Sequence, residues 1–137
     1  MKPPVTLQLV WEKELIFSGE SNHAAMTLDS AGEAGPSPVQ AMAFALAGCM
    51  AMDLVYILQK GRQDLRGLAI EMRAERAPDT PHRITSVEMR FILTGSIADA
   101  QVQRAIDLSR EKYCSVWHTF RQDIPLETSF TVAAPAA

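Results

Sequence analysis

The sequence predicts an α+β fold, because short segments of alternating polarity surround one long apolar helix and a second, one-sided helix. The expected order of elements is βββ-α-ββ-α-α-β, with the strands in antiparallel sheets. The chain has 137 residues, enough to bury a core of its own but too few for two stable domains. We therefore expect a single domain over residues 1–137.

Three short strands are expected before residue 30. Polar and apolar residues alternate over residues 5–11, and further strands are predicted at 14–18 and 24–29. Tight turns are expected at residues 12–13 and 19–22, where charged residues, Gly and Asn occur. These segments predict a small antiparallel meander.

A long helix is predicted from Pro38 to Lys60. Ser37 is a good N-cap, Pro38 suits the first helical position, and Gly61 is expected to end the helix. The helix is apolar nearly all round, which is typical of a helix buried on most sides. Residues 41–58 carry one charge, that of Asp53, and approach the length of a membrane span. We favour a buried central helix without membrane insertion, covered by a second copy of the chain.

The second half of the chain predicts three more strands and two helices. Polarity alternates over residues 68–74, 87–93 and 126–132. Ser96 is expected to cap a helix that has one apolar stripe and extends to Tyr113, followed by one or two further helical turns. The helices are therefore segregated from the strands.

Composition excludes several classes of protein. The formal net charge is −3, so no basic footprint for nucleic acid is present. Two cysteines exclude a disulfide-dense scaffold, and the three histidines are scattered singly, so no metal site and no cofactor are expected. The N-terminus lacks the features of a signal peptide, and we expect a cytoplasmic location.

Cys49 and Cys114 are the two candidates for chemistry, and they stand 65 residues apart. A free cysteine on an apolar helix is often only a small buried hydrophobe. In the cytoplasm a cysteine pair is more often catalytic than structural. Residue spacing alone leaves both interpretations open.

The segments GPSPVQAMAFALAGCMAMDLVYIL and LSREKYCSVWHTF, which contain the two cysteines, resemble the OsmC/Ohr family of osmotically inducible and organic hydroperoxide resistance proteins. The resemblance implies a thiol-dependent peroxidase built as an intertwined homodimer with sites at the subunit interface. It also implies that Cys49 is the peroxidatic cysteine and Cys114 the resolving cysteine. A thiol reductant would restore the resulting disulfide.

The sequence departs from the family pattern in the charges expected near the first cysteine. The peroxidases carry a Glu ten positions before it, where this chain has Val39, with Gln40 as the nearest polar residue. They also use an Arg from the N-terminal strands, whereas the first arginine here is Arg62. The resemblance is therefore to an OsmC-like branch without the usual Arg and Glu, and slow peroxide reduction is expected.

Three side chains are candidates for supporting roles, and the first is Gln40, the polar residue nearest to the position of the usual Glu. Asp53 follows Cys49 by four residues and shares its helix face, so it either assists the thiol or bonds the partner subunit. His118 follows Cys114 by four residues and either accepts a proton or has no catalytic role. Two functions stay open: a peroxidase acting on small organic hydroperoxides, or a redox-sensing dimer that binds a small apolar ligand.

Overall fold

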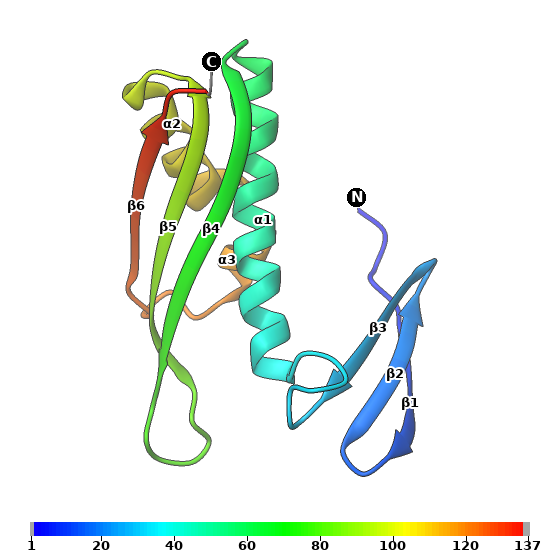
Figure 1. Ribbon diagram of the computed structural model, residues 1–137. Coiled ribbons are helices and arrows are strands. Elements are labelled where there is room, and N and C mark those ends of the chain that lie inside the picture. Colours follow the sequence, from blue (N-terminus) through cyan, green and yellow to red (C-terminus); the bar gives the residue numbers. More distant parts are fainter. Residues whose placement is uncertain (1, 136–137) are drawn as a thin grey trace. The chain divides into compact units, whose positions relative to one another are not determined.

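The computed structural model describes residues 2–135 and has the predicted order of elements, with one additional π-helical turn (Figure 1). The chain forms two compact units, residues 1–44 and 45–137, and the boundary falls within the long helix. The elements are β1 (Gln8–Lys13), β2 (Ile16–Ser21), β3 (Ala24–Asp29), α1 (Pro38–Lys60), β4 (Asp64–Arg76), β5 (Ile84–Ser96), α2 (Asp99–Leu108), η1 (Ser109–Tyr113), α3 (Ser115–Thr119) and β6 (Leu126–Ala133).

The first unit contains the predicted antiparallel meander in the order β1-β2-β3. Its turns lie later than predicted, at Glu14 and Asn22, which both have positive φ angles. Gly19, expected in a turn, lies inside β2, where a Cβ atom would overlap the carbonyl oxygen of Gln8. The close approach of the two strands therefore requires glycine at this position. In the sequence alone, the same glycine indicates a turn.

Side chains organise the loop that precedes α1. The Asp29 carboxylate accepts hydrogen bonds from the backbone N–H groups of residues 31, 33 and 34, which lower its pKa. Ser37 Oγ accepts a bond from the N–H of Gln40, and Gln40 Oε1 accepts one from the N–H of Ser37. This reciprocal pair is a capping box, and it fixes the start of α1 at the predicted residue.

Helix α1 has the predicted bounds, but the conformation of the residues that follow it differs from the expectation. Arg62, not Gly61, adopts the left-handed conformation after the helix. Within one chain α1 buries a single row of side chains, and its most apolar 18-residue window is only 22% buried. The helix is also long and apolar enough to cross a membrane by length and composition. The buried row consists of Leu46, Met50, Leu54 and Leu58.

The second sheet has the order β4-β5-β6, and its central strand β5 contributes five buried apolar side chains to the core of residues 45–137. Strands β4 and β5 pair antiparallel, with apolar partners such as Ile70 and Phe91 facing the core. Strand β6 pairs parallel with β5, so the expectation of wholly antiparallel sheets is wrong for this pair. The helices between Ser96 and Leu126 form the crossover that parallel pairing requires.

Helix α2 differs from the prediction at both ends. Ser96 belongs to β5, and the N-cap is Ala98, which makes no side-chain cap bond. The regular helix ends at Leu108 and continues as the π-helical turn η1, closed by a 2.8 Å bond from the Cys114 N–H to the Ser109 carbonyl. Single π-helical turns frequently lie at functional sites.

Replacement of Leu54 by Ala tests the buried row of α1. Leu54 is fully buried, so we expect Leu54→Ala to lower the free energy of unfolding by about 2–5 kcal/mol. Gln59→Ala, at an exposed position of the same helix, is the control and should change it by less than about 0.5 kcal/mol. Urea unfolding followed by circular dichroism measures both, and equal midpoints for the two variants would contradict this packing.

Candidate functional site

Helix α1 places Cys49 and Asp53 in one row beside its buried stripe. The two residues are one turn apart, and both are half-buried. Their neighbours Met50 and Leu54 are fully buried, and this packing fixes which face of the helix points into the core. The row that contains Cys49 therefore lies at the edge of the core, where a side chain reaches both protein and solvent.

Cys114 lies where the π-helical turn meets α3. It is the N-cap residue of α3, and its Sγ accepts a 3.3 Å hydrogen bond from the Trp117 N–H. The side chain is fully buried. Cys114 therefore lies at the start of a short helix, where its sulfur caps the first turn.

The fold brings the two cysteines together from distant parts of the sequence. The Sγ atoms of Cys49 and Cys114 and a carboxylate oxygen of Asp53 all lie within 4.8 Å of one another. Both cysteines are free thiols. A half-buried thiol thus lies beside a fully buried one, with a carboxylate next to both.

Ser109 is a member of this site that sequence reasoning missed. Its Oγ donates a 2.8 Å hydrogen bond to Oδ2 of Asp53, and the serine is fully buried. It continues the apolar stripe of α2 that includes Val102 and Ile106. A polar residue on an otherwise apolar stripe was the available signal, because a buried hydroxyl needs a partner. The Asp53 carboxylate therefore has a partner within its own chain.

The surroundings of Cys114 disfavour its ionised form. Burial raises the pKa of Cys114 to about 12, and the neighbouring Cys49 and Asp53 also raise it. The N–H of Trp117 acts in the opposite direction, because it donates to the sulfur. At neutral pH the Cys114 side chain is therefore a thiol, which is a poor nucleophile.

Gln40 and His118 make bonds elsewhere. The Gln40 side-chain oxygen is held in the capping box of α1. Nε2 of His118 lies 3.0 Å from the carbonyl oxygen of Arg110, which makes the ring a donor to the π-helical turn. Within residues 2–135, neither side chain hydrogen-bonds a cysteine. Both side chains therefore support the local backbone.

A groove of about 610 Å³ opens next to Asp53. Its walls combine aromatic and aliphatic side chains with the cationic groups of Lys60 and Arg104. Such a surface suits a molecule that has an apolar body and a polar or anionic end. The lining residues are Asp53, Tyr56, Ile57, Lys60, Gly61, Arg104, Leu108 and Tyr113.

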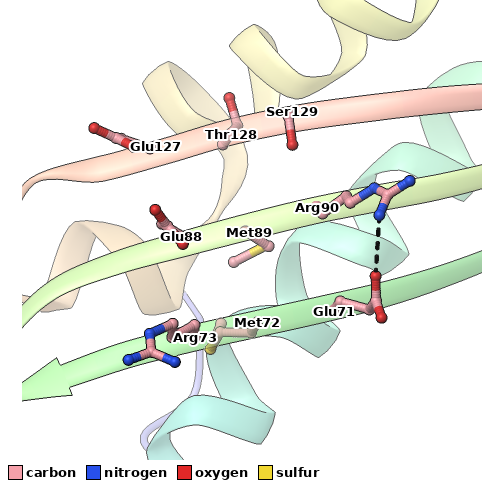
Figure 2. Close-up of a pocket in the computed structure, with 9 residues that line it drawn as sticks. All are labelled: Glu71, Met72, Arg73, Glu88, Met89, Arg90, Glu127, Thr128 and Ser129. Carbon is pink, nitrogen blue, oxygen red and sulfur yellow. Dashed lines mark ion pairs between the residues drawn. The ribbon is translucent and has the colours of Figure 1, made fainter.

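A second hollow, of about 380 Å³, lies over β4, β5 and β6 (Figure 2). Its charged side chains compensate each other, as in the 3.6 Å ion pair between Arg90 and Glu71. The residues that line it include no cysteine and no histidine. Its chemistry is that of a solvated sheet face, so the cysteine cluster is the better candidate site.

Comparison with known proteins bears on this site directly. The model of the family described as OsmC-like protein matches residues 30–129, which include both cysteines. The chain belongs to the OsmC-like family. This confirms the resemblance inferred from the two cysteine-containing segments.

Individual OsmC-like relatives match over nearly the whole chain. Protein YhfA of Escherichia coli strain K12 is 39% identical over 127 residues, covering 90% of this chain and 95% of YhfA. The OsmC-like protein of Mycoplasma pneumoniae has a TM-score of 0.84 at 13% identity, covering 97% of this chain and 99% of its own. The organic hydroperoxide resistance protein OhrB of Bacillus subtilis has a TM-score of 0.62 at 12% identity, covering 93% and 98%. These structures confirm the α+β fold.

The unequal burial of the two thiols predicts unequal alkylation rates. In the folded, reduced protein at pH 8, iodoacetamide should label Cys49 first. Cys114 should react about tenfold faster for each added pH unit up to its pKa of about 12, because thiolate is the reactive form. Peptide mapping by mass spectrometry measures both rates, and urea-unfolded protein, in which the two rates should converge, is the control. Rapid labelling of Cys114 in the folded protein at pH 8 would contradict its burial.

Proposed function

We propose that this protein is a thiol-dependent peroxidase that reduces organic hydroperoxides through Cys49 and Cys114. The supporting observation is a pair of sulfur atoms within 4.8 Å of each other, one half-buried and one fully buried. Membership of the OsmC-like family, and the shared fold with a protein named for organic hydroperoxide resistance, point to the same chemistry.

Cys49 is the better candidate for the attacking thiol, because its side chain is the more accessible of the two. Its thiolate attacks one oxygen of the hydroperoxide, and the O–O bond breaks. The sulfur is oxidised to a sulfenic acid, and the leaving alkoxide takes up a proton to become an alcohol.

Cys114 then resolves the sulfenic acid. Its sulfur attacks the oxidised sulfur of Cys49, a disulfide forms, and the hydroxyl group leaves with the thiol proton as water. The proton must be lost during this attack, because Cys114 is a thiol at neutral pH. A small thiol or a dithiol protein then reduces the disulfide by exchange.

We expect this reaction to be slow compared with that of the family's peroxidases. The position of the usual Glu is occupied by Val39, and no arginine precedes Arg62. The Asp53 carboxylate takes part in no ion pair within residues 2–135. The Arg and Glu of the family pattern are therefore missing from the positions where they are expected.

The active form is proposed to be a homodimer in the cytoplasm. On α1, Met52 is 73% exposed and Tyr56 is 65% exposed. In the first unit, Trp11 and other apolar side chains are exposed, and between residues 2 and 44 only Asp29 is buried. A three-stranded sheet without buried apolar residues is marginal by itself. A second copy would cover these surfaces, and two-fold dimers are the commonest soluble assembly.

The alternative function is a redox-sensing or ligand-binding dimer without turnover. The groove beside Asp53, with its apolar walls, and the lack of the usual Arg and Glu favour this second candidate. Its ligand would be a small apolar molecule. The two functions differ in whether a hydroperoxide is consumed.

Cumene hydroperoxide tests the peroxidase. One equivalent added to the reduced protein should remove both thiols and yield a Cys49–Cys114 disulfide, which peptide mapping detects. Addition of dithiothreitol should then support repeated turnover of the hydroperoxide. Cys49→Ser should abolish consumption, whereas Cys114→Ser should consume one equivalent and accumulate the sulfenic acid. Unchanged thiols in the wild-type protein would favour the ligand-binding alternative.

Light scattering tests the dimer. The measured mass should be about twice 15.1 kDa. Met52→Glu, which puts a charge on the exposed apolar face of α1, should shift the population to monomer. Ser129→Glu adds the same charge on the polar face of β6 next to Arg90 and should leave the mass unchanged. A folded monomer of the wild-type chain at micromolar concentration would overturn the proposal.

A further inference from the structure

The cluster that contains the two cysteines also has the composition of a metal site. Sγ of Cys49, Sγ of Cys114 and a carboxylate oxygen of Asp53 lie within 4.8 Å of one another. In a tetrahedral zinc site the metal lies about 2.3 Å from sulfur and about 2.1 Å from oxygen, which separates neighbouring ligand atoms by roughly 3.5–3.8 Å. The separations of the three atoms, at most 4.8 Å, are close to this spacing.

We propose that the reduced protein binds one Zn²⁺ ion per chain through Cys49, Asp53 and Cys114, with water in the fourth position. Thiolate sulfur and carboxylate oxygen are both regular zinc ligands. Three protein ligands with one open position are typical of zinc sites that exchange ligands. Both thiols release their protons to solvent when the ion binds.

The groups around the cluster suit a metal site. Ser109 Oγ donates to Oδ2 of Asp53 at 2.8 Å, which orients the carboxylate and leaves its other oxygen for the ion. The Trp117 N–H donates to Sγ of Cys114 at 3.3 Å, a bond that stabilises a coordinated thiolate. Hydrogen bonds of this kind fix the ligands of metal sites and raise the affinity.

Charge and access favour a small cation as the occupant. The deprotonated ligand set carries three negative charges, and no ion pair within residues 2–135 involves Asp53. A divalent ion offsets most of this charge in a place of low exposure. Asp53 also lines the groove of about 610 Å³, so the carboxylate side of the cluster borders open space.

Zinc binding stands without the peroxidase, but one consequence rests on the proposed function. A disulfide between Cys49 and Cys114 has no thiolate to offer, so oxidation by a hydroperoxide should release the ion. Conversely, bound zinc occupies the Cys49 sulfur and should protect it from the hydroperoxide. The same three side chains would then hold metal or react with peroxide, but not both.

Cobalt provides the test, because Co²⁺ replaces Zn²⁺ and is coloured. Titration of reduced, chelator-treated, tag-free protein should produce a thiolate-to-cobalt charge-transfer band and the intense visible bands of tetrahedral Co²⁺. The bands should saturate at one ion per chain, and Zn²⁺ should displace the cobalt. Absence of the charge-transfer band in folded protein would overturn the site.

Variants locate the ion. Cys114→Ser keeps an oxygen at the cap of α3, and circular dichroism checks that this variant folds. The variant should lose the tetrahedral cobalt spectrum at one ion per chain. Asp53→Asn and Ser109→Ala should weaken zinc affinity about 10- to 100-fold in competition with a chromogenic chelator. Asp107→Asn, which removes an exposed carboxylate on α2, is the control and should bind zinc like the wild type. Wild-type affinity in Asp53→Asn would overturn the three-ligand site.

Peroxide consumption by the metal-free protein separates the two proposals. Consumption without a cobalt band would overturn the zinc site alone. A cobalt band without consumption supports the zinc site and counts against the peroxidase. When both are present, one equivalent of Zn²⁺ should slow consumption at least tenfold, and unchanged consumption with bound zinc would overturn the competition.

Discussion

Burial of one row of α1 side chains decides where Cys49 and Asp53 of the reactive cluster lie. Leu46, Met50, Leu54 and Leu58 recur every four residues and pack into the core of residues 45–137. With successive residues about 100° apart around a helix, this row fixes the rotation of α1. Cys49 and Asp53 consequently lie at the edge of the core, neither sealed within it nor fully in water.

The π-helical turn complements this arrangement from the other side of the site. In a regular helix the N–H of Cys114 would bond the carbonyl four residues before it. In the wider π-helical turn this N–H bonds the carbonyl of Ser109, five residues before it. This turn leaves the Ser109 hydroxyl on the Asp53 carboxylate and the Cys114 sulfur at the cap of α3. A hydrogen bond to a charged group contributes about 1.5–3 kcal/mol. The bond from Ser109 to Asp53 therefore offsets the less favourable backbone geometry of the π-helical turn.

The site gathers two thiols and a carboxylate, and no ion pair within residues 2–135 involves that carboxylate. Such a set has two physical outcomes. Its thiols can react with an electrophilic oxygen and join as a neutral disulfide, or they can lose their protons to a divalent ion. Both outcomes use the same three side chains. Because Val39 departs from the family pattern, membership of the OsmC-like family does not by itself define the activity.

The order of elements, the bounds of α1 and the family could be predicted from the sequence, because periodicity, capping and motifs depend on residues that are neighbours in the chain. The turns around Gly19 and the cap of α2 were misplaced, because close strand contacts and an uncapped helix start leave no local signal. The parallel pairing of β6 and the bond from Ser109 to Asp53 emerged with the packed fold, which also supplied the distance between Cys49 and Cys114 that the family resemblance had only implied to be short. Each of these joins residues far apart in the chain, and such contacts follow from how helices and strands pack together rather than from the pattern within any one of them.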